Sequence, residues 1–116
     1  MTVNLWVDDV KDPTLLAQYL LGENEPTVWV WARTAASARM VLFSPGTRIA
    51  HLALDNDMGE GALNDGRAIA HEILQRVLDD ETYDPPMYMH CISGNPIAAR
   101  EIEATFNDIA KVRMTR

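Results

Sequence analysis

The feature that most constrains the fold is a regular alternation of short apolar segments with segments of helical periodicity. The short segments are rich in strand-forming residues and lie at residues 3–7, 27–31, 49–54 and 87–92. After each of them, apolar residues recur at the three- and four-residue spacing of a helix that packs one face on a core. Strands separated by helices join through right-handed crossovers into a parallel sheet. The sequence therefore predicts an α/β fold in which residues 1–116 form one domain.

Residues that favour helix starts precede each of the four expected helices. An aspartate, threonine or asparagine caps the first backbone N–H groups of a helix, and a proline fits the first helical position. The predicted starts are Asp12-Pro13, Thr34, Asp65 and Asn95-Pro96. The first helix is expected to end at Gly22 and the second at about Phe43.

Composition limits the classes of protein to which the chain can belong. Hydrophobic residues make up 47% of the 116 residues and charged residues 23%, as in ordinary globular domains. The formal net charge of −7 argues against a general nucleic-acid-binding surface. No apolar stretch has the length of a membrane span, and no signal peptide is evident. Because Cys91 is the single cysteine, we expect a cytoplasmic protein without a disulfide framework.

Two groups of acidic residues follow the first and third predicted strands. Asp8 and Asp9 follow the first strand, and Asp55 and Asp57 follow the third. Ligands of an open parallel sheet bind beyond the carboxyl ends of its strands, so these side chains are expected to converge there. Converging carboxylates repel one another unless a divalent cation or shared protons offset the charge. The pattern predicts an acid/base site or a Mg²⁺ or Mn²⁺ site, and the alternative is that these acids only cap helices and occupy turns.

His90 near the end of the fourth predicted strand is the third element of the candidate site. A histidine there can act as a general acid or base near neutral pH, or it can orient a phosphate oxygen. Ser93 and Asn95 come just after it and precede the last helix. They are candidate phosphate-binding residues at a helix N-terminus, and their alternative role is to cap that helix.

Structural roles are assigned to the other histidines and to two tryptophans. His51 lies within the third strand and His71 within a helix, and both are expected in the core or against a helix. Trp29 and Trp31 share one face of the second strand, and we expect them to pack that strand against a helix.

The Asp8-Asp9 pair, Asp55 and the alternating units together resemble a response-regulator receiver domain. The resemblance implies a flavodoxin-like, three-layer α/β/α sandwich, truncated to a (βα)4-type parallel sheet with strand order 2-1-3-4. It implies that Mg²⁺ binds Asp9, Asp55 and the backbone carbonyl of Asp57, with Asp8 in support. The chain departs from a receiver because His90 stands where a Ser or Thr is usual. It also offers no fifth strand ending in lysine.

Three short motifs resemble a narrower family, the cyclic-phosphate-processing receiver-like domain of bacteria and their phages. The motifs are Leu5-Trp6-Val7-Asp8-Asp9, Leu54-Asp55-Asn56-Asp57-Met58-Gly59, and His90 with Ser93 and Asn95-Pro96. The family typically has an LDD-type start, an LDHDLG-type centre and an HS-x-NP-type end. Asn56 therefore stands where the family has a histidine, and the segment Cys91-Ile92-Ser93-Gly94 is longer than usual.

This resemblance implies metal-dependent hydrolysis of cyclic phosphates, such as 2′,3′-cyclic ends of RNA or cyclic nucleotides. Asp55, Asp57 and His90 are the candidate catalytic residues, and Asp8, Asp9, Asp55 and Asp57 are the candidate metal ligands. If the chain is encoded by a phage, the expected location is the host cytoplasm.

Two functions of other classes remain open. One is a degenerate, catalytically inactive receiver that acts as a protein-interaction module, in which Asp55 accepts a phosphoryl group or nothing. The other is a small acidic inhibitor, encoded by a phage, that uses its charge of −7 to bind a basic groove of a host protein.

Overall fold

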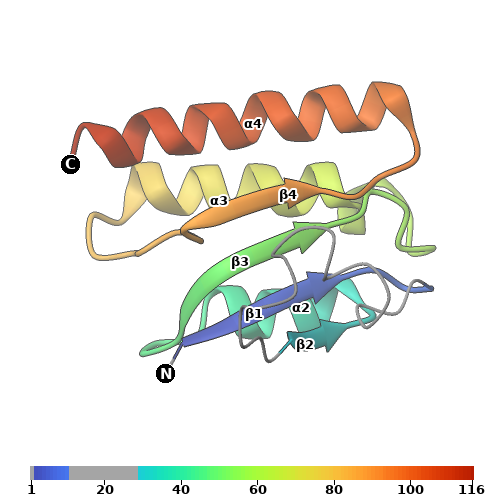
Figure 1. The fold of residues 1–116 in the computed structure, drawn as a ribbon, viewed down its shortest axis with the longest axis horizontal. Coiled ribbons are helices and arrows are strands. Elements are labelled where there is room, and N and C mark those ends of the chain that lie inside the picture. The colour runs from blue at the N-terminus through green and yellow to red at the C-terminus, as the bar shows by residue number, and fades with distance from the viewer. Residues whose placement is uncertain (1, 11–28) are drawn as a thin grey trace, which may run out of the picture.

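A four-stranded parallel sheet forms the centre of the computed structural model, which describes residues 2–10 and 29–116. The strands are arranged in the order β2-β1-β3-β4, so the predicted order is confirmed (Figure 1). The elements are β1 (Thr2–Val7), β2 (Trp29–Ala32), α2 (Ala35–Leu42), β3 (Arg48–Leu54), a 3-10 helix η1 (Ala62–Asn64), α3 (Gly66–Asp79), β4 (Tyr88–Cys91) and α4 (Pro96–Met114).

The helices α2, α3 and α4 pack on one face of this sheet, and α3 and α4 lie side by side (Figure 1). Alternate strand residues point to that face, and they form a single core with apolar residues of all three helices. The strand residues of this core include Leu5, Val7, Leu52 and Leu54. The helix expected from Pro13 to Gly22 lies outside the described residues, so the second helical layer of the predicted sandwich is not tested.

Each of the three predicted helix starts in the described residues is confirmed by a side-chain cap. The Oγ1 of Thr34 accepts the N–H of Ser37, and a carboxylate oxygen of Asp65 accepts the N–H of Ala68. The Oδ1 of Asn95 accepts two N–H groups at the start of α4, where a proline occupies the first helical position. These caps are local, which explains why the sequence alone reveals them.

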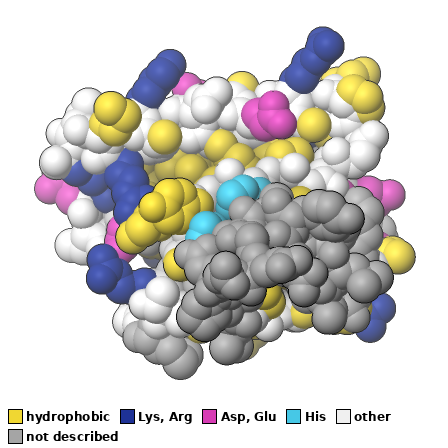
Figure 2. All heavy atoms as spheres, viewed as in Figure 1, with side chains coloured by type: hydrophobic (Ala, Val, Ile, Leu, Met, Phe, Trp, Pro, Cys, Tyr) yellow, Lys and Arg dark blue, Asp and Glu magenta, His cyan; other side chains and the backbone are white. Residues whose placement is uncertain are grey.

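The opposite face of the sheet carries aromatic and histidine side chains. Trp6 and Trp29 meet edge to face with ring centroids 5.5 Å apart, and the Nε1 of Trp31 donates to the backbone oxygen of Asp8 at 2.8 Å. The Arg33 guanidinium also lies over the Trp31 ring, 4.8 Å from its centroid. Packing of these tryptophans against a helix stays a prediction, because the helix expected from Pro13 to Gly22 lies outside the described residues. Figure 2 shows histidine side chains at the surface, beside a group of hydrophobic side chains.

Among the described residues, none of the helices has the length and apolar character needed to cross a membrane.

Candidate functional site

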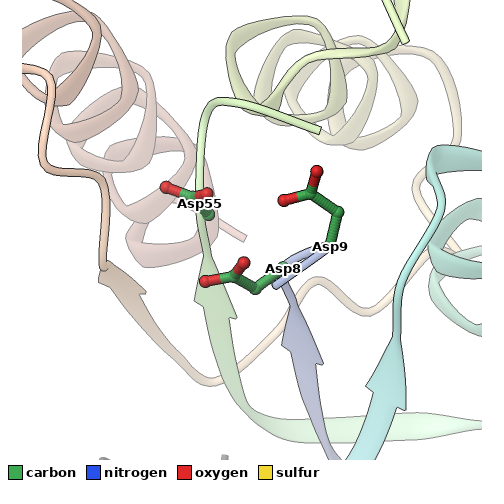
Figure 3. A group of neighbouring side chains, drawn as sticks. All are labelled: Asp8, Asp9 and Asp55. Atoms are coloured by element: carbon green, nitrogen blue, oxygen red, sulfur yellow. The ribbon is translucent and has the colours of Figure 1, made fainter. Parts of the chain in front are cut away.

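Three carboxylates converge at the carboxyl ends of β1 and β3. The backbone ladder continues one step past both strands, because Asp8 N–H donates to the oxygen of Ala32 at 3.2 Å and Asp55 N–H donates to the oxygen of Val7 at 2.9 Å. The ladder holds both backbones at the same edge of the sheet. One carboxylate oxygen from each of Asp8, Asp9 and Asp55 lies within 4.8 Å of the others (Figure 3). The predicted convergence of the two acidic groups is therefore observed for these residues.

The donor set of this acidic cluster, Asp8, Asp9 and Asp55, fits a hard divalent cation. Asp8 is 1% exposed and Asp55 is 7% exposed, so their mutual repulsion is poorly screened by water. Mg²⁺ prefers oxygen ligands at about 2.1 Å, and 4.8 Å is only slightly more than twice that distance. Small side-chain rotations would bring all three oxygens to one ion. Among residues 2–10 and 29–116, these three carboxylates form a group that could hold a divalent metal ion.

The side chain of Asp57 lies apart from the acidic cluster. It is exposed, and its Oδ1 accepts the N–H of Gly59 at 3.0 Å in the loop after β3. Gly59 has a φ of +69°, and a Cβ atom there would lie 3.3 Å from the Oδ2 of Asp9. The loop therefore passes closely over the acidic cluster. A metal ligand at the backbone carbonyl of Asp57 stays a prediction.

The position of Asp55 is fixed by the start of α3. Gly66 N–H donates to the backbone oxygen of Asn56 at 2.8 Å, and Arg67 N–H donates to the Oδ1 of the same asparagine at 3.3 Å. Asn56 is buried, with 7% of its surface exposed. The asparagine that replaces the usual histidine of the central motif therefore binds the first turn of α3.

His90 lies on β4 and forms a hydrogen-bonded pair with His51 of β3. The Nε2 of His90 is 3.0 Å from the Nδ1 of His51. Burial lowers the pKa of His90 below its ordinary value of 6.5, and the nearby His51 lowers it further. Both effects favour the neutral form of His90, which is the form that can accept a proton.

His51 is the residue of this region whose role the sequence did not indicate. It was expected in the core or against a helix. It is half-buried and its ring contacts His90 and Tyr88, and a contact with the first expected helix is not tested because that helix lies outside the described residues. Its place on the strand face of Ala53 follows from alternation, and Ala53 is paired with His90. The alternation could have placed His51 on this face. The contact with His90 depends on the register between β3 and β4, which the sequence does not give.

Ser93 and Asn95 have the capping roles that the sequence offered as an alternative. Ser93 Oγ accepts the N–H of Asn95 at 3.1 Å, and Asn95 Oδ1 accepts the N–H groups of Ile97 and Ala98 at 3.1 and 3.2 Å. Ile92 N–H donates to the oxygen of Leu54 at 3.0 Å, so this segment begins beside the end of β3. Capping uses the oxygens of both side chains. It leaves the hydroxyl hydrogen of Ser93 and the amide hydrogens of Asn95 to donate elsewhere.

The parallel sheet, its strand order and the acidic cluster at its carboxyl edge define a receiver-like α/β domain. The family model of the cyclic-phosphate processing receiver domain matches residues 3–108. The chain therefore belongs to this family, and the predicted membership is confirmed. Searches of curated proteins and of solved structures gave no significant match.

Proposed function

We propose that this domain hydrolyses cyclic phosphates in a metal-dependent reaction. The substrates would be 2′,3′-cyclic phosphate ends of RNA or cyclic nucleotides. The family supports this proposal through its cyclic-phosphate processing description. The observation that carries it is the convergence of Asp8, Asp9 and Asp55 within 4.8 Å at the strand ends, because clustered carboxylates suit the metal chemistry that phosphoryl transfer needs.

Asp9 and Asp55 are the proposed metal ligands, with Asp8 in support and with the carbonyl of Asp57 as a further ligand. A bound Mg²⁺ or Mn²⁺ would polarise a phosphoryl oxygen or lower the pKa of a bound water. The buried positions of Asp8 and Asp55 keep competing water away from these carboxylates. This burial strengthens their attraction for a cation.

His90 is the proposed acid/base residue, and its lowered pKa suits the neutral, proton-accepting form. In hydrolysis, a water oxygen forms a bond to phosphorus while the bond from phosphorus to one ribose oxygen breaks. The water loses a proton and the ribose oxygen gains one, and the product is a phosphate monoester. His90 takes the first of these protons or supplies the second.

Ser93 and Asn95 are the proposed contacts to the non-bridging phosphate oxygens. The N–H groups of Ile97 and Ala98 already donate to Asn95, so the backbone of the first turn of α4 has little donor capacity left. The hydroxyl of Ser93 and the amide of Asn95 remain as donors, because their capping bonds use only oxygen atoms.

Phosphorus NMR of product formation tests the reaction. The purified chain with Mg²⁺ or Mn²⁺ is incubated with 2′,3′-cyclic nucleotides, and separately with an RNA oligomer that ends in a 2′,3′-cyclic phosphate. We expect conversion to phosphate monoesters that is abolished by EDTA. Asp55→Asn and His90→Gln should each lower kcat, whereas Asp108→Asn, at an exposed carboxylate of α4, should leave it unchanged.

A small phosphodonor distinguishes the receiver alternative. If the cyclic substrates stay intact while the chain gains one phosphoryl group by intact mass, and Asp55→Asn abolishes this gain, the inactive receiver is the better description. Salt-sensitive capture of a host protein that persists in Asp9→Ala and Asp55→Ala would instead favour an acidic inhibitor.

A further inference from the structure

We propose that His51 is a positioning residue for His90. It engages the Nε2 of His90, so that the Nδ1 of His90 is the atom that exchanges a proton with the substrate. This inference rests on the proposed function, and it assigns a task to a histidine that no motif of the chain singles out.

The two imidazole rings meet edge to edge. Their planes differ by 11° and their centroids are 5.3 Å apart, whereas the facing nitrogens are only 3.0 Å apart. Because ring nitrogens lie on the rim of the ring, near-parallel rings with these two distances lie almost in one plane. A hydrogen bond between rings in one plane lies along the lone pair of the acceptor, which is its most favourable direction. The contact is therefore a directed hydrogen bond and not ring stacking.

A third ring holds His51 in this orientation. Tyr88 of β4 is paired with His51 in the register of the two strands, and the rings stack with centroids 4.8 Å apart and planes 24° apart. The backbone of His51 is also fixed, since its N–H donates to the Oδ1 of Asn4 at 3.2 Å. His51 is thus held by its own strand, by Tyr88 and by His90. A side chain held in this way can orient its neighbour.

The positions of the N–H hydrogens on the two rings determine which nitrogen of His90 can react. Two neutral imidazoles carry one N–H each, so a single proton lies between the facing nitrogens. When the Nε2–H of His90 donates to His51, the Nδ1 of His90 has a free lone pair and can take a proton from water. The resulting imidazolium still donates its Nε2–H to His51, in a bond that the charge makes stronger. The proton taken at Nδ1 then leaves to the ribose oxygen or to solvent.

The opposite arrangement cannot serve the same step. If the Nδ1–H of His51 donates to His90, then His90 carries its own proton at Nδ1 and has no lone pair for a proton of water. Burial and the proximity of His51 lower the pKa of His90. Tyr88 stacks on His51, and the carboxylates of Asp8, Asp9 and Asp55 cluster at the ends of β1 and β3.

Nitrogen-15 NMR of the free protein in EDTA tests the hydrogen bond without any substrate. We expect a slowly exchanging Nε2–H of His90, a nitrogen–nitrogen coupling across the bond to Nδ1 of His51, and an unprotonated Nδ1 of His90. His51→Leu should abolish the coupling. A missing coupling in the wild type, or a proton that belongs to Nδ1 of His51, would overturn the proposal.

Kinetics then test the consequence for the reaction. His51→Leu should lower kcat by about 10–100-fold with little change in KM, as is typical when an orienting partner of a reactive group is lost. His51→Gln keeps an acceptor and should recover part of the loss, while His71→Leu, at an exposed histidine of α3, should change nothing. Equal losses in kcat for His51→Leu and His51→Gln would contradict positioning. Absence of turnover in the wild type would remove the proposed function but leave the NMR result to decide the hydrogen bond.

Discussion

Gly66 lies against the backbone of Asp55 so closely that no larger residue fits. A Cβ atom on Gly66 would be 2.8 Å from the carbonyl carbon of Asp55 and still closer to its carbonyl oxygen. Here the requirement for glycine comes from close packing and not from a positive φ. The first turn of α3 therefore holds the backbone that presents Asp55 to the acidic cluster.

Gly66→Ala is expected to destabilise the domain and to weaken metal binding. The added methyl group must displace the backbone of Asp55 or the start of α3, and such overpacking typically costs about 1–3 kcal/mol. Urea unfolding gives the change in stability, and Mn²⁺ titration gives the change in affinity. Gly94→Ala is the matched control, because a Cβ at Gly94 meets nothing within 4 Å. Equal behaviour of the two variants would contradict this account of Gly66.

Asp9→Ala and Asp55→Ala are each expected to weaken Mn²⁺ binding. Loss of an outer-shell partner already lowers metal affinity by about 10–100-fold, so loss of a ligand should lower it at least as much. Asp57→Asn keeps its backbone carbonyl and should change the affinity little, since its side chain bonds to Gly59. Calorimetric titration measures the Mn²⁺ affinity of all three variants. A large loss in Asp57→Asn with no loss in Asp9→Ala would show that the ion binds elsewhere.

The stability of the domain is expected to fall as the pH drops below about 6.5. The pKa of His90 is lower in the folded chain than its ordinary value, so the unfolded chain binds a proton more readily in this range. The contribution of His90 is present above the unfolded pKa and is lost as the pH falls through the folded pKa. Urea unfolding of the wild type and of His90→Gln, at pH values between about 7.5 and 5, measures this contribution to the free energy of unfolding.

In that series, the difference in unfolding free energy between wild type and His90→Gln should shrink toward low pH. His71→Gln is the control variant, because it removes an exposed histidine of α3. A difference that grows as the pH falls would mean that the folded state favours the protonated form of His90.

Arg39→Lys is expected to lower the unfolding free energy by about 0.5–1 kcal/mol. Arg39 of α2 donates to both carboxylate oxygens of Glu72 on α3, to Asn64 Oδ1 and to the oxygen of Leu63. A lysine cannot reproduce this fork of donors, although it keeps the charge. Both partners of the ion pair are about one-third exposed, which limits the effect. Thermal unfolding of Arg39→Lys and Arg39→Ala measures it, and an unchanged Tm in both would contradict it.

The parts of the fold that depend on local signals could be predicted from the sequence. The caps Thr34, Asp65 and Asn95 act within three residues, so each helix start is encoded beside the helix that it begins. The four strands are short and strongly apolar, and their alternation with helices fixes a parallel sheet. The order of the strands came from the resemblance, and it is confirmed.

The parts that depend on register could not be predicted. β1 and β3 change register between Val3 and Leu5, and a shift of one residue moves side chains to the other face of a sheet. The side-chain hydrogen bond between His51 and His90 depends on the alignment of two strands that are separated by the whole of α3. The carboxylates were easier to predict, because strand ends meet at one edge whatever the register.

The acidic cluster is shared between two strands that are distant along the chain, and this has a consequence for folding kinetics. Asp9 and Asp55 come together only after β3 has docked beside β1, which requires closure of a long loop. A cation held by both strands therefore stabilises the finished sheet more than any partly folded chain. Such an ion should slow unfolding and leave the folding rate nearly unchanged. The persistence of the folded domain would then follow the concentration of divalent cations around it.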